Sequence, residues 1–220
     1  MNRELLVVDD IAAAAATIFL DLAPRTVALA GGSTPKALYE LLATRAYRWS
    51  ETAVFFGDER CVPPDDLASN YRMAHEALLS KVEARVHRMR GESCDAVGYE
   101  AELREVFGPG IPEFDVIFLG LGADGHTASL FPGDLAALAE RERLVIKVER
   151  PDFRRLSLTL PLLSAAKRVV FLVAGAEKTW ALRALMAGRD IPAAMVRARQ
   201  VTVICDRAAA VELPARQVLN

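Results

Sequence analysis

Residues 114–133 read FDVIFLGLGADGHTASLFPG. The first six are mostly apolar and predict a buried strand, and the glycines that follow predict a turn at its carboxyl end. In an open α/β sheet, ligands bind in the crevice beyond the carboxyl ends of the strands. His126 lies in this turn, and an imidazole exchanges protons near neutral pH, so it is the candidate catalytic base. The alternative is a histidine that only completes a polar turn.

Strands and helices alternate along most of the chain. Continuous apolar runs and period-2 patterns predict strands, and helical spacing predicts helices. The predicted strands cover residues 5–8, 27–30, 53–56, 114–119, 144–148, 156–160, 169–173 and 201–204, and the predicted helices cover residues 11–22, 35–43, 71–82, 99–106, 178–186 and 207–211. This order predicts an α/β fold with a doubly wound, largely parallel sheet and helices on both faces. We expect one domain over residues 1–220, because no linker-like segment divides the chain.

A second glycine turn follows the predicted strand at 27–30. It reads GGSTPK over residues 31–36 and leads into a helical pattern. Glycines let an anion approach the backbone closely, and the free N–H groups at a helix start favour phosphate. Ser33 or Thr34 could instead cap an ordinary helix. The spacing of a Walker loop and the G-x-G-x-x-G pattern are both missing, so the turn favours a smaller phosphorylated ligand over a nucleotide.

Charge and cysteine content exclude several classes of protein. The net charge is −2, which gives no electrostatic basis for binding nucleic acid. The N-terminal residues do not resemble a signal peptide and no apolar run could span a bilayer, so we expect a cytoplasmic protein without a membrane partner, either a monomer or a weak homo-oligomer. Cys61, Cys94 and Cys205 are scattered and odd in number, which predicts free thiols rather than disulfides or a metal site.

More polar clusters follow other predicted strands. Asp58, Glu59 and Arg60 come directly after the strand at 53–56, so they should lie at the same edge of the sheet. They could bind hydroxyls or form an ion network, or they could be a solvated charged loop. Asn70 opens the next predicted helix, where capping is the alternative to a role in the crevice.

Two basic residues follow later in the chain. Arg155, Ser157 and Thr159 alternate with apolar residues, as on a strand with one solvated face. The Arg155 guanidinium could hold a phosphate, although an exposed arginine at a strand start is also common. Lys178 stands near a predicted helix start, where the helix dipole disfavours a cation, and this placement favours an anionic partner.

Five segments together resemble the motifs of a known family. They are GGSTP at 31–35, GDER at 57–60 with SNY at 69–71, DGHTASLFP at 124–132, RLSLTLP at 155–161 and GAEK at 175–178. In this order, over nearly the whole chain, they resemble the 6-phosphogluconolactonases of the glucosamine-6-phosphate isomerase/6-phosphogluconolactonase family. The resemblance implies a doubly wound α/β fold. It also implies hydrolysis of 6-phospho-D-glucono-1,5-lactone to 6-phospho-D-gluconate in the oxidative pentose phosphate pathway, with no cofactor and no metal. One departure is Ala30, where many members carry serine.

The two alternative functions are a deaminase and a sensor. A glucosamine-6-phosphate deaminase shares the fold and the glycine loop, but its histidine is followed by Ile-Ala-Phe-Asn-Glu-Pro. Phe131 stands here in place of that glutamate, and Arg60 stands where the deaminase has tyrosine, so both differences favour the lactonase. A sugar-phosphate sensor that does not turn over its ligand is disfavoured, since no helix-turn-helix segment or basic patch is present.

Each cluster has a predicted role in hydrolysis of the lactone. His126 is the general base that activates water and then the acid that protonates the leaving ring oxygen. Arg60 or backbone N–H groups of the glycine turns stabilise the oxyanion, and Asp124 either orients His126 or binds a sugar hydroxyl. The predicted substrate and phosphate contacts are Gly31, Gly32, Ser33, Thr34, Asp58, Asn70, Arg155 and Lys178.

Overall fold

A parallel sheet forms the centre of the computed structural model, which describes residues 3–211. Within these residues its strands are β1 (Glu4–Val7), β2 (Thr26–Leu29), β3 (Ala53–Phe56), β5 (Arg85–Val86), β6 (Val116–Gly120), β9 (Arg168–Val173) and β10 (Gln200–Cys205). Their spatial order is β1-β10-β9-β6-β2-β3-β5, and each neighbouring pair is parallel. The prediction of a largely parallel sheet is confirmed.

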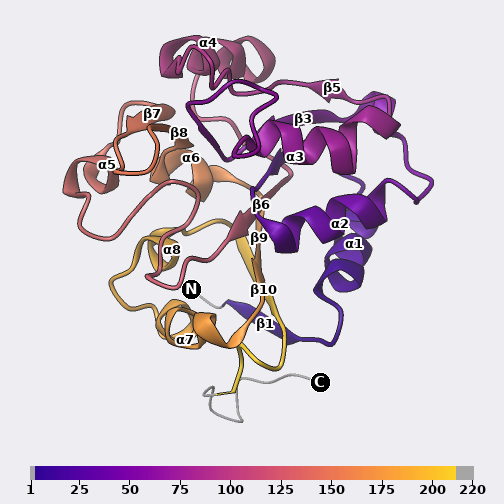
Figure 1. Cartoon of the computed structure of the whole chain (residues 1–220), viewed down its shortest axis with the longest axis vertical. Coiled ribbons are helices and arrows are strands. Elements are labelled where there is room, and N and C mark those ends of the chain that lie inside the picture. The colour runs from indigo at the N-terminus through magenta and orange to yellow at the C-terminus, as the bar shows by residue number, and fades with distance from the viewer. Residues whose placement is uncertain (1–2, 212–220) are drawn as a thin grey trace.

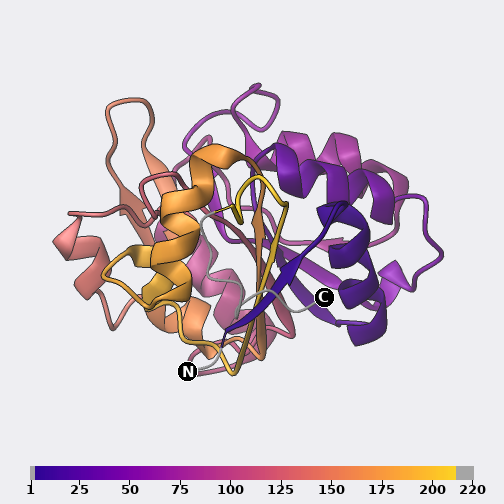
Figure 2. The same ribbon diagram turned by 90° about the horizontal axis from the view of Figure 1, so that it is seen from below.

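Helices cover both faces of this sheet. They are α1 (Ile11–Leu22), α2 (Ser33–Leu42), α3 (Asn70–Ala77), α4 (Ala96–Phe107), α5 (Leu135–Ala139), α6 (Leu160–Ala165), α7 (Thr179–Met186) and α8 (Pro192–Met195). α1 packs beside α2, and α2 packs beside α3. Figure 2 shows α1 and α2 on one side of the sheet and α7 on the other, which confirms the doubly wound arrangement.

The order of the strands identifies the crevice. From β2 the chain continues to β3 and β5 on one side, whereas from β6 it continues to β9 and β10 on the other (Figure 1). β2 and β6 are therefore the adjacent strands at which the winding reverses. Ligands of doubly wound folds bind beyond the carboxyl ends of such a pair. Both glycine turns of the sequence begin at these two strand ends.

Burial explains why the central strands are so apolar. The side chains of Val116, Ile117 and Phe118 on β6 are completely buried, because helices cover both faces of the parallel sheet. Leu119 continues this run to the edge of the crevice with 1% of its surface exposed. The strand therefore places the turn that follows it on a rigid base.

A small antiparallel sheet lies beside the main one. It has the order β4-β8-β7, with β4 (Asp58–Arg60), β8 (Arg155–Leu158) and β7 (Val145–Val148). In its register Asp58 pairs with Ser157, and Arg60 pairs with Arg155. The prediction that β8 has one solvated face is wrong, because all four of its residues are buried. The loop expected at residues 57–60 is therefore partly a strand.

Several predicted boundaries also differ. The strand expected at 156–160 ends at Leu158, because α6 starts at Leu160 with Pro161 in its first turn, where proline fits without loss of a hydrogen bond. The helix expected at 71–82 ends at Ala77 and is followed by a short 3-10 turn. The helix expected at 207–211 is a series of turns.

The prediction of three free thiols is wrong. Cys61 and Cys94 form a disulfide with their Cα atoms 5.0 Å apart, and only Cys205 among the three is free and buried. Cys61 directly follows β4, and Cys94 lies in the turn before α4, so the fold brings together residues that are 33 positions apart. In residues 3–211 no helix is long and apolar enough to cross a membrane.

Candidate active site

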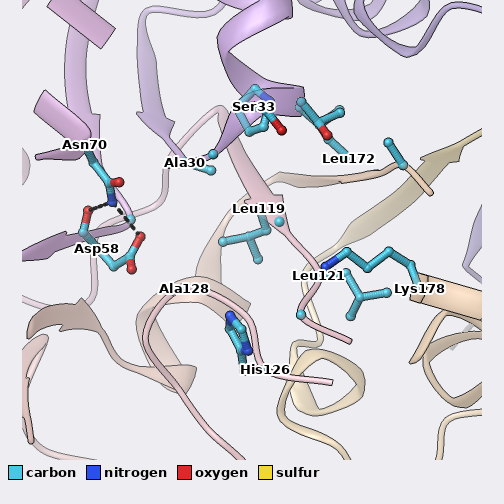
Figure 3. Close-up of a pocket in the computed structure, with 18 of the residues that line it drawn as sticks. Ala30, Ser33, Asp58, Asn70, Leu119, Leu121, His126, Ala128, Leu172 and Lys178 are labelled. Atoms are coloured by element: carbon cyan, nitrogen blue, oxygen red, sulfur yellow. Dashed lines mark hydrogen bonds between the residues drawn. The ribbon is translucent and has the colours of Figure 1, made fainter. Parts of the chain in front are cut away.

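One cavity of about 310 Å³ opens at the carboxyl ends of β2 and β6. Its lining includes ten of the predicted site residues, which come from distant parts of the chain: Gly31, Gly32, Ser33, Thr34, Asp58, Arg60, Asn70, His126, Arg155 and Lys178. Figure 3 shows Ser33 and Lys178 on one side of the cavity, Asp58 and Asn70 opposite them, and His126 between the two groups. Apolar side chains, including Leu119, Leu121 and Leu172, complete the wall.

The glycine loop after β2 carries the start of α2. Gly32 is the N-cap of this helix, and no side-chain capping bond forms there within the described residues, so Ser33 and Thr34 do not cap the helix. Both are in its first turn, where backbone N–H groups have no partner inside the helix. These groups and the helix dipole make this end of the cavity suitable for an anion.

Tyr39 fixes the backbone just before this loop. Its hydroxyl accepts a hydrogen bond from the Ala30 N–H at 2.8 Å and donates one to the Ala30 carbonyl at 2.9 Å. The side chain is completely buried, and this burial raises the pKa of the phenol. Tyr39 therefore remains a neutral hydrogen-bonding group at the base of the loop.

Asp58, Arg60 and Asn70 form a hydrogen-bonded cluster. The Asn70 amide nitrogen donates to the Asp58 carbonyl at 2.9 Å and to its carboxylate at 3.3 Å. The Arg60 Nη1 atom donates to the Asn70 side-chain oxygen at 2.8 Å and to the Ala68 carbonyl at 3.0 Å. Asn70 thus links the guanidinium to the carboxylate and fixes the orientation of both.

Glu59 supports this cluster from behind. The carboxylate is only 2% exposed and accepts hydrogen bonds from the backbone N–H groups of Arg60, Asn70 and Tyr71 at 2.7 to 2.8 Å. The Ser69 hydroxyl donates to it as well, at 3.0 Å. Burial raises the pKa of Glu59, and these hydrogen bonds oppose that shift. The sequence left open whether Glu59 binds hydroxyls. In the structure its carboxylate instead accepts hydrogen bonds from backbone N–H groups at the start of α3.

The turn after β6 pairs His126 with Asp124. The Asp124 carboxylate lies 2.6 Å from the His126 Nδ1 atom and also accepts the His126 backbone N–H at 3.0 Å. Gly122 is required here, because an added Cβ would lie 2.0 Å from that Nδ1 atom. Burial acts to raise the pKa of Asp124, but hydrogen bonds from the backbone and ring of His126 outweigh it and lower the pKa.

The position of this pair distinguishes its two members. His126 lines the cavity, whereas Asp124 lies outside the lining formed by the described residues. A neutral imidazole with Nδ1–H donated to the carboxylate has Nε2 free to accept a proton. The geometry thus favours orientation of His126 over hydroxyl binding as the role of Asp124.

Ser129 supports the site from outside the cavity lining of the described residues, a role that the sequence did not single out. It is completely buried, and its hydroxyl donates to the Asp58 carboxylate at 2.6 Å. Its backbone N–H in turn donates to the Ser157 hydroxyl on β8 at 3.2 Å. Ser129 thus ties the turn that carries His126 to Asp58 on β4. The motif contains this serine, but only the tertiary fold shows what it contacts.

Arg155 and Lys178 bring two positive charges to the cavity. Arg155 is 9% exposed, on β8 beside Arg60 of β4. Lys178 follows β9 and is the N-cap of α7, with its Nζ atom 4.0 Å from Glu177. Both line the same cavity as Ser33.

The described residues contain no group of three histidine, cysteine or acidic side chains that could hold a metal ion. The cavity brings together the His126 imidazole, which pairs with Asp124, the start of α2, three cationic side chains, and the hydrogen-bonded Asp58 and Asn70.

Comparison with known proteins identifies the family of the chain. The model of a family described as glucosamine-6-phosphate isomerases/6-phosphogluconolactonase matches residues 5–205. The chain belongs to this family. It is 43% identical to a 6-phosphogluconolactonase of Synechocystis sp. over 205 residues, which cover 87% of this chain and 85% of that relative.

Solved structures of family members share the fold. A 6-phosphogluconolactonase from Trypanosoma cruzi has a TM-score of 0.88 at 29% identity, and the match covers 98% of this chain and 99% of that one. A monomeric glucosamine-6-phosphate deaminase has a TM-score of 0.80 at 23% identity, with coverage of 96% and 99%. Since both activities occur on this fold, the side chains in the cavity must distinguish them.

Proposed function

We propose that this chain hydrolyses 6-phospho-D-glucono-1,5-lactone to 6-phospho-D-gluconate, a step of the oxidative pentose phosphate pathway. The observation that carries the proposal is that one cavity is lined both by His126, which pairs with Asp124, and by a phosphate-type loop with Arg155 and Lys178. Water is the only co-reactant that this reaction needs. The 6-phosphogluconolactonase relatives of the chain support the same activity.

His126 acts as a base and then as an acid. Its Nε2 atom takes a proton from water while Asp124 holds Nδ1–H, and the hydroxide forms a bond to the lactone carbonyl carbon. The tetrahedral intermediate then breaks its bond to the ring oxygen, which takes the proton back from the imidazolium. No net proton is consumed by the enzyme.

The negative charge of the intermediate requires a donor in the same cavity. Arg60 is suited to this role, because Asn70 and the Ala68 carbonyl hold the guanidinium through Nη1 and its other N–H groups remain available to an oxyanion. Asp58 and Asn70 are positioned to bind sugar hydroxyls. A donor fixed before the reaction stabilises the transition state without a cost of reorganisation.

The phosphate binds in the same cavity. The start of α2, at Gly31, Gly32, Ser33 and Thr34, supplies backbone N–H groups and hydroxyls, and Arg155 and Lys178 supply positive charge. Anchoring the phosphate orients the carbonyl next to His126, an effect worth several kcal/mol when the geometry is good.

The deaminase alternative is disfavoured by one contact. Phe131 stands in place of the deaminase glutamate, and its ring centroid lies 4.6 Å from that of His126. The Phe131 side chain is 6% exposed and offers no group for proton transfer. The base therefore has an apolar neighbour where the deaminase would carry a second acid.

The test is to follow freshly generated 6-phospho-D-glucono-1,5-lactone above its spontaneous hydrolysis. We expect rapid loss with the enzyme, and a kcat/KM at least about 100-fold lower for the unphosphorylated lactone, which lacks the anchor. Glucosamine 6-phosphate with an ammonia readout serves as the second substrate. Ammonia release without lactone hydrolysis would replace the proposal with the deaminase, and tight binding of 6-phosphogluconate without either reaction would replace it with a sensor.

A further inference from the structure

Arg155 has a hydrogen-bond donor in its guanidinium that the described residues leave unpaired. Its side chain is 11% exposed and lines the cavity, yet its buried Nε atom has no hydrogen-bond partner among residues 3–211. Leaving a buried donor unpaired is costly, so the fold retains such a group where something else completes it. In a cavity with a phosphate-type loop, the group that would complete it is an anion.

Among residues 3–211, the hydrogen-bond partner of the Arg155 guanidinium is the Asp152 carboxylate. Nη2 of Arg155 donates to the Asp152 carboxylate. A guanidinium binds phosphate bidentately through one of two pairs of N–H groups, and Nη2 belongs to both pairs. Nη2 has two N–H groups, so a phosphate that binds Arg155 in this way either lies next to the Asp152 carboxylate on the same nitrogen, where the two negative charges repel each other, or displaces the carboxylate.

Asp152 is well placed to be displaced. It lies in the segment between β7 and β8, its side chain is 54% exposed, and it is outside the cavity lining of the described residues. Burial acts to raise its pKa, but hydrogen bonds from the Phe153 backbone and from Arg155 outweigh it, so the pKa is lowered. Water can solvate the carboxylate once it leaves Arg155.

Arg155 does not need Asp152 to keep its position. Its strand β8 is paired on both sides, with Arg60 of β4 and with Val148 of β7 as its partners in register. The guanidinium carbon also lies 5.5 Å from the centre of the Phe131 ring, within the range of a cation–π contact. The strand pairing therefore holds the Arg155 backbone, and the ring contacts its guanidinium, both without the carboxylate.

We propose that Asp152 is an internal competitor for Arg155, a specificity-determining residue that lowers the affinity of the cavity for phosphorylated ligands. The inference rests on the proposed function, because it takes the ligand to be a sugar phosphate. In the unliganded enzyme the carboxylate holds Nη2, and the phosphate replaces it on binding. When the product leaves, Asp152 takes Arg155 back, which favours release of the anion.

The test measures binding without turnover. 6-Phosphogluconate and inorganic phosphate are titrated calorimetrically into the wild type and into Asp152→Asn, which keeps the shape of the side chain and removes its charge. We expect Asp152→Asn to bind both ligands about 3- to 10-fold more tightly, or about 0.7 to 1.4 kcal/mol. The KM for the lactone should fall by a similar factor with kcat unchanged or lower.

A matched control separates this effect from a general change in charge. Glu149→Gln removes an exposed negative charge from the same segment. We expect it to change the affinity less than about 2-fold, since exposed charges are screened by water and salt. An equal gain in Glu149→Gln would show a long-range charge effect and would overturn the proposal.

Two further outcomes are decisive. Unchanged or weaker binding by Asp152→Asn would make Asp152 a positioning residue for Arg155 and overturn the competition. In Arg155→Ala we expect at least 10-fold weaker phosphate binding and no further gain from Asp152→Asn. If Arg155→Ala binds phosphate as tightly as the wild type, the phosphate assignment in the proposed function fails as well, which distinguishes the two failures.

Discussion

Reduction of the disulfide between Cys61 and Cys94 should destabilise the protein by a predictable amount. The two cysteines are 33 positions apart. A cross-link that closes a loop of this length removes about 12.5 cal/mol/K of chain entropy from the unfolded state, or about 3.7 kcal/mol at 25 °C. With a urea m-value of about 2.5 kcal/mol/M, this corresponds to a loss of roughly 1.5 M in the midpoint of unfolding.

The assay is urea unfolding of the wild type with and without dithiothreitol, followed by circular dichroism. Cys61→Ser/Cys94→Ser is the control, and its midpoint should match that of the reduced wild type and be insensitive to the reductant. Titration of thiols in denaturant should give one thiol without reduction, from Cys205, and three after it. Three thiols before reduction, or a midpoint that dithiothreitol leaves unchanged, would refute the reasoning.

Three substitutions test other parts of the site. In Gly31→Ala the new Cβ would meet the Asn70 side-chain oxygen at 2.0 Å, so we expect kcat/KM to fall at least about 10-fold in the lactone assay with little change in the urea midpoint. Asp124→Asn should lower kcat about 10- to 100-fold. Because hydrogen bonds from His126 lower the pKa of Asp124, its carboxylate stays charged along the acid limb of the wild-type kcat/KM profile. That limb should therefore fit one ionisation, and a profile that needs two would contradict this. Glu59→Gln turns an amide group toward N–H donors and should lower the free energy of unfolding by about 1 to 3 kcal/mol, measured in urea; an unchanged value would contradict the buried network.

The sequence predicted the sheet and the crevice because both depend on local patterns. The apolar run that ends at Leu119 and the strand before Gly31 each led into a glycine turn, and parallel strands bring such turns to one edge. The structure places His126 and Ser33 in one cavity at that edge, with Arg155 beside them. Their roles in catalysis and binding remain predictions.

The sequence did not predict features that depend on contacts between distant segments. The disulfide joins Cys61 and Cys94 across 33 positions, and a count of three cysteines carries no sign of that pairing. The alternation of polar and apolar residues predicts a solvated face on β8, but the turn at Ser129 packs on that face and donates a hydrogen bond to Ser157. Ser129 lies inside a recognised motif, yet its bond to the Asp58 carboxylate exists only once β4 and the turn after β6 are in place.

The pairing of Arg155 with Asp152 is local, yet the sequence did not predict it either. Their spacing of three residues suggests no contact on a strand, where such residues point to opposite faces. The contact forms because Asp152 lies in the bend before β8 rather than on the strand itself.

The most direct test of the proposed mechanism compares lactone hydrolysis by the wild type, His126→Asn and His75→Asn. His75 lies on α3, outside the cavity lining of the described residues, so its replacement controls for loss of a histidine. We expect His126→Asn to lose at least about 100-fold in kcat while retaining the native circular dichroism spectrum and affinity for 6-phosphogluconate, and His75→Asn to keep wild-type activity. A folded His126→Asn enzyme that hydrolyses the lactone at the wild-type rate would contradict the role of His126 as the base.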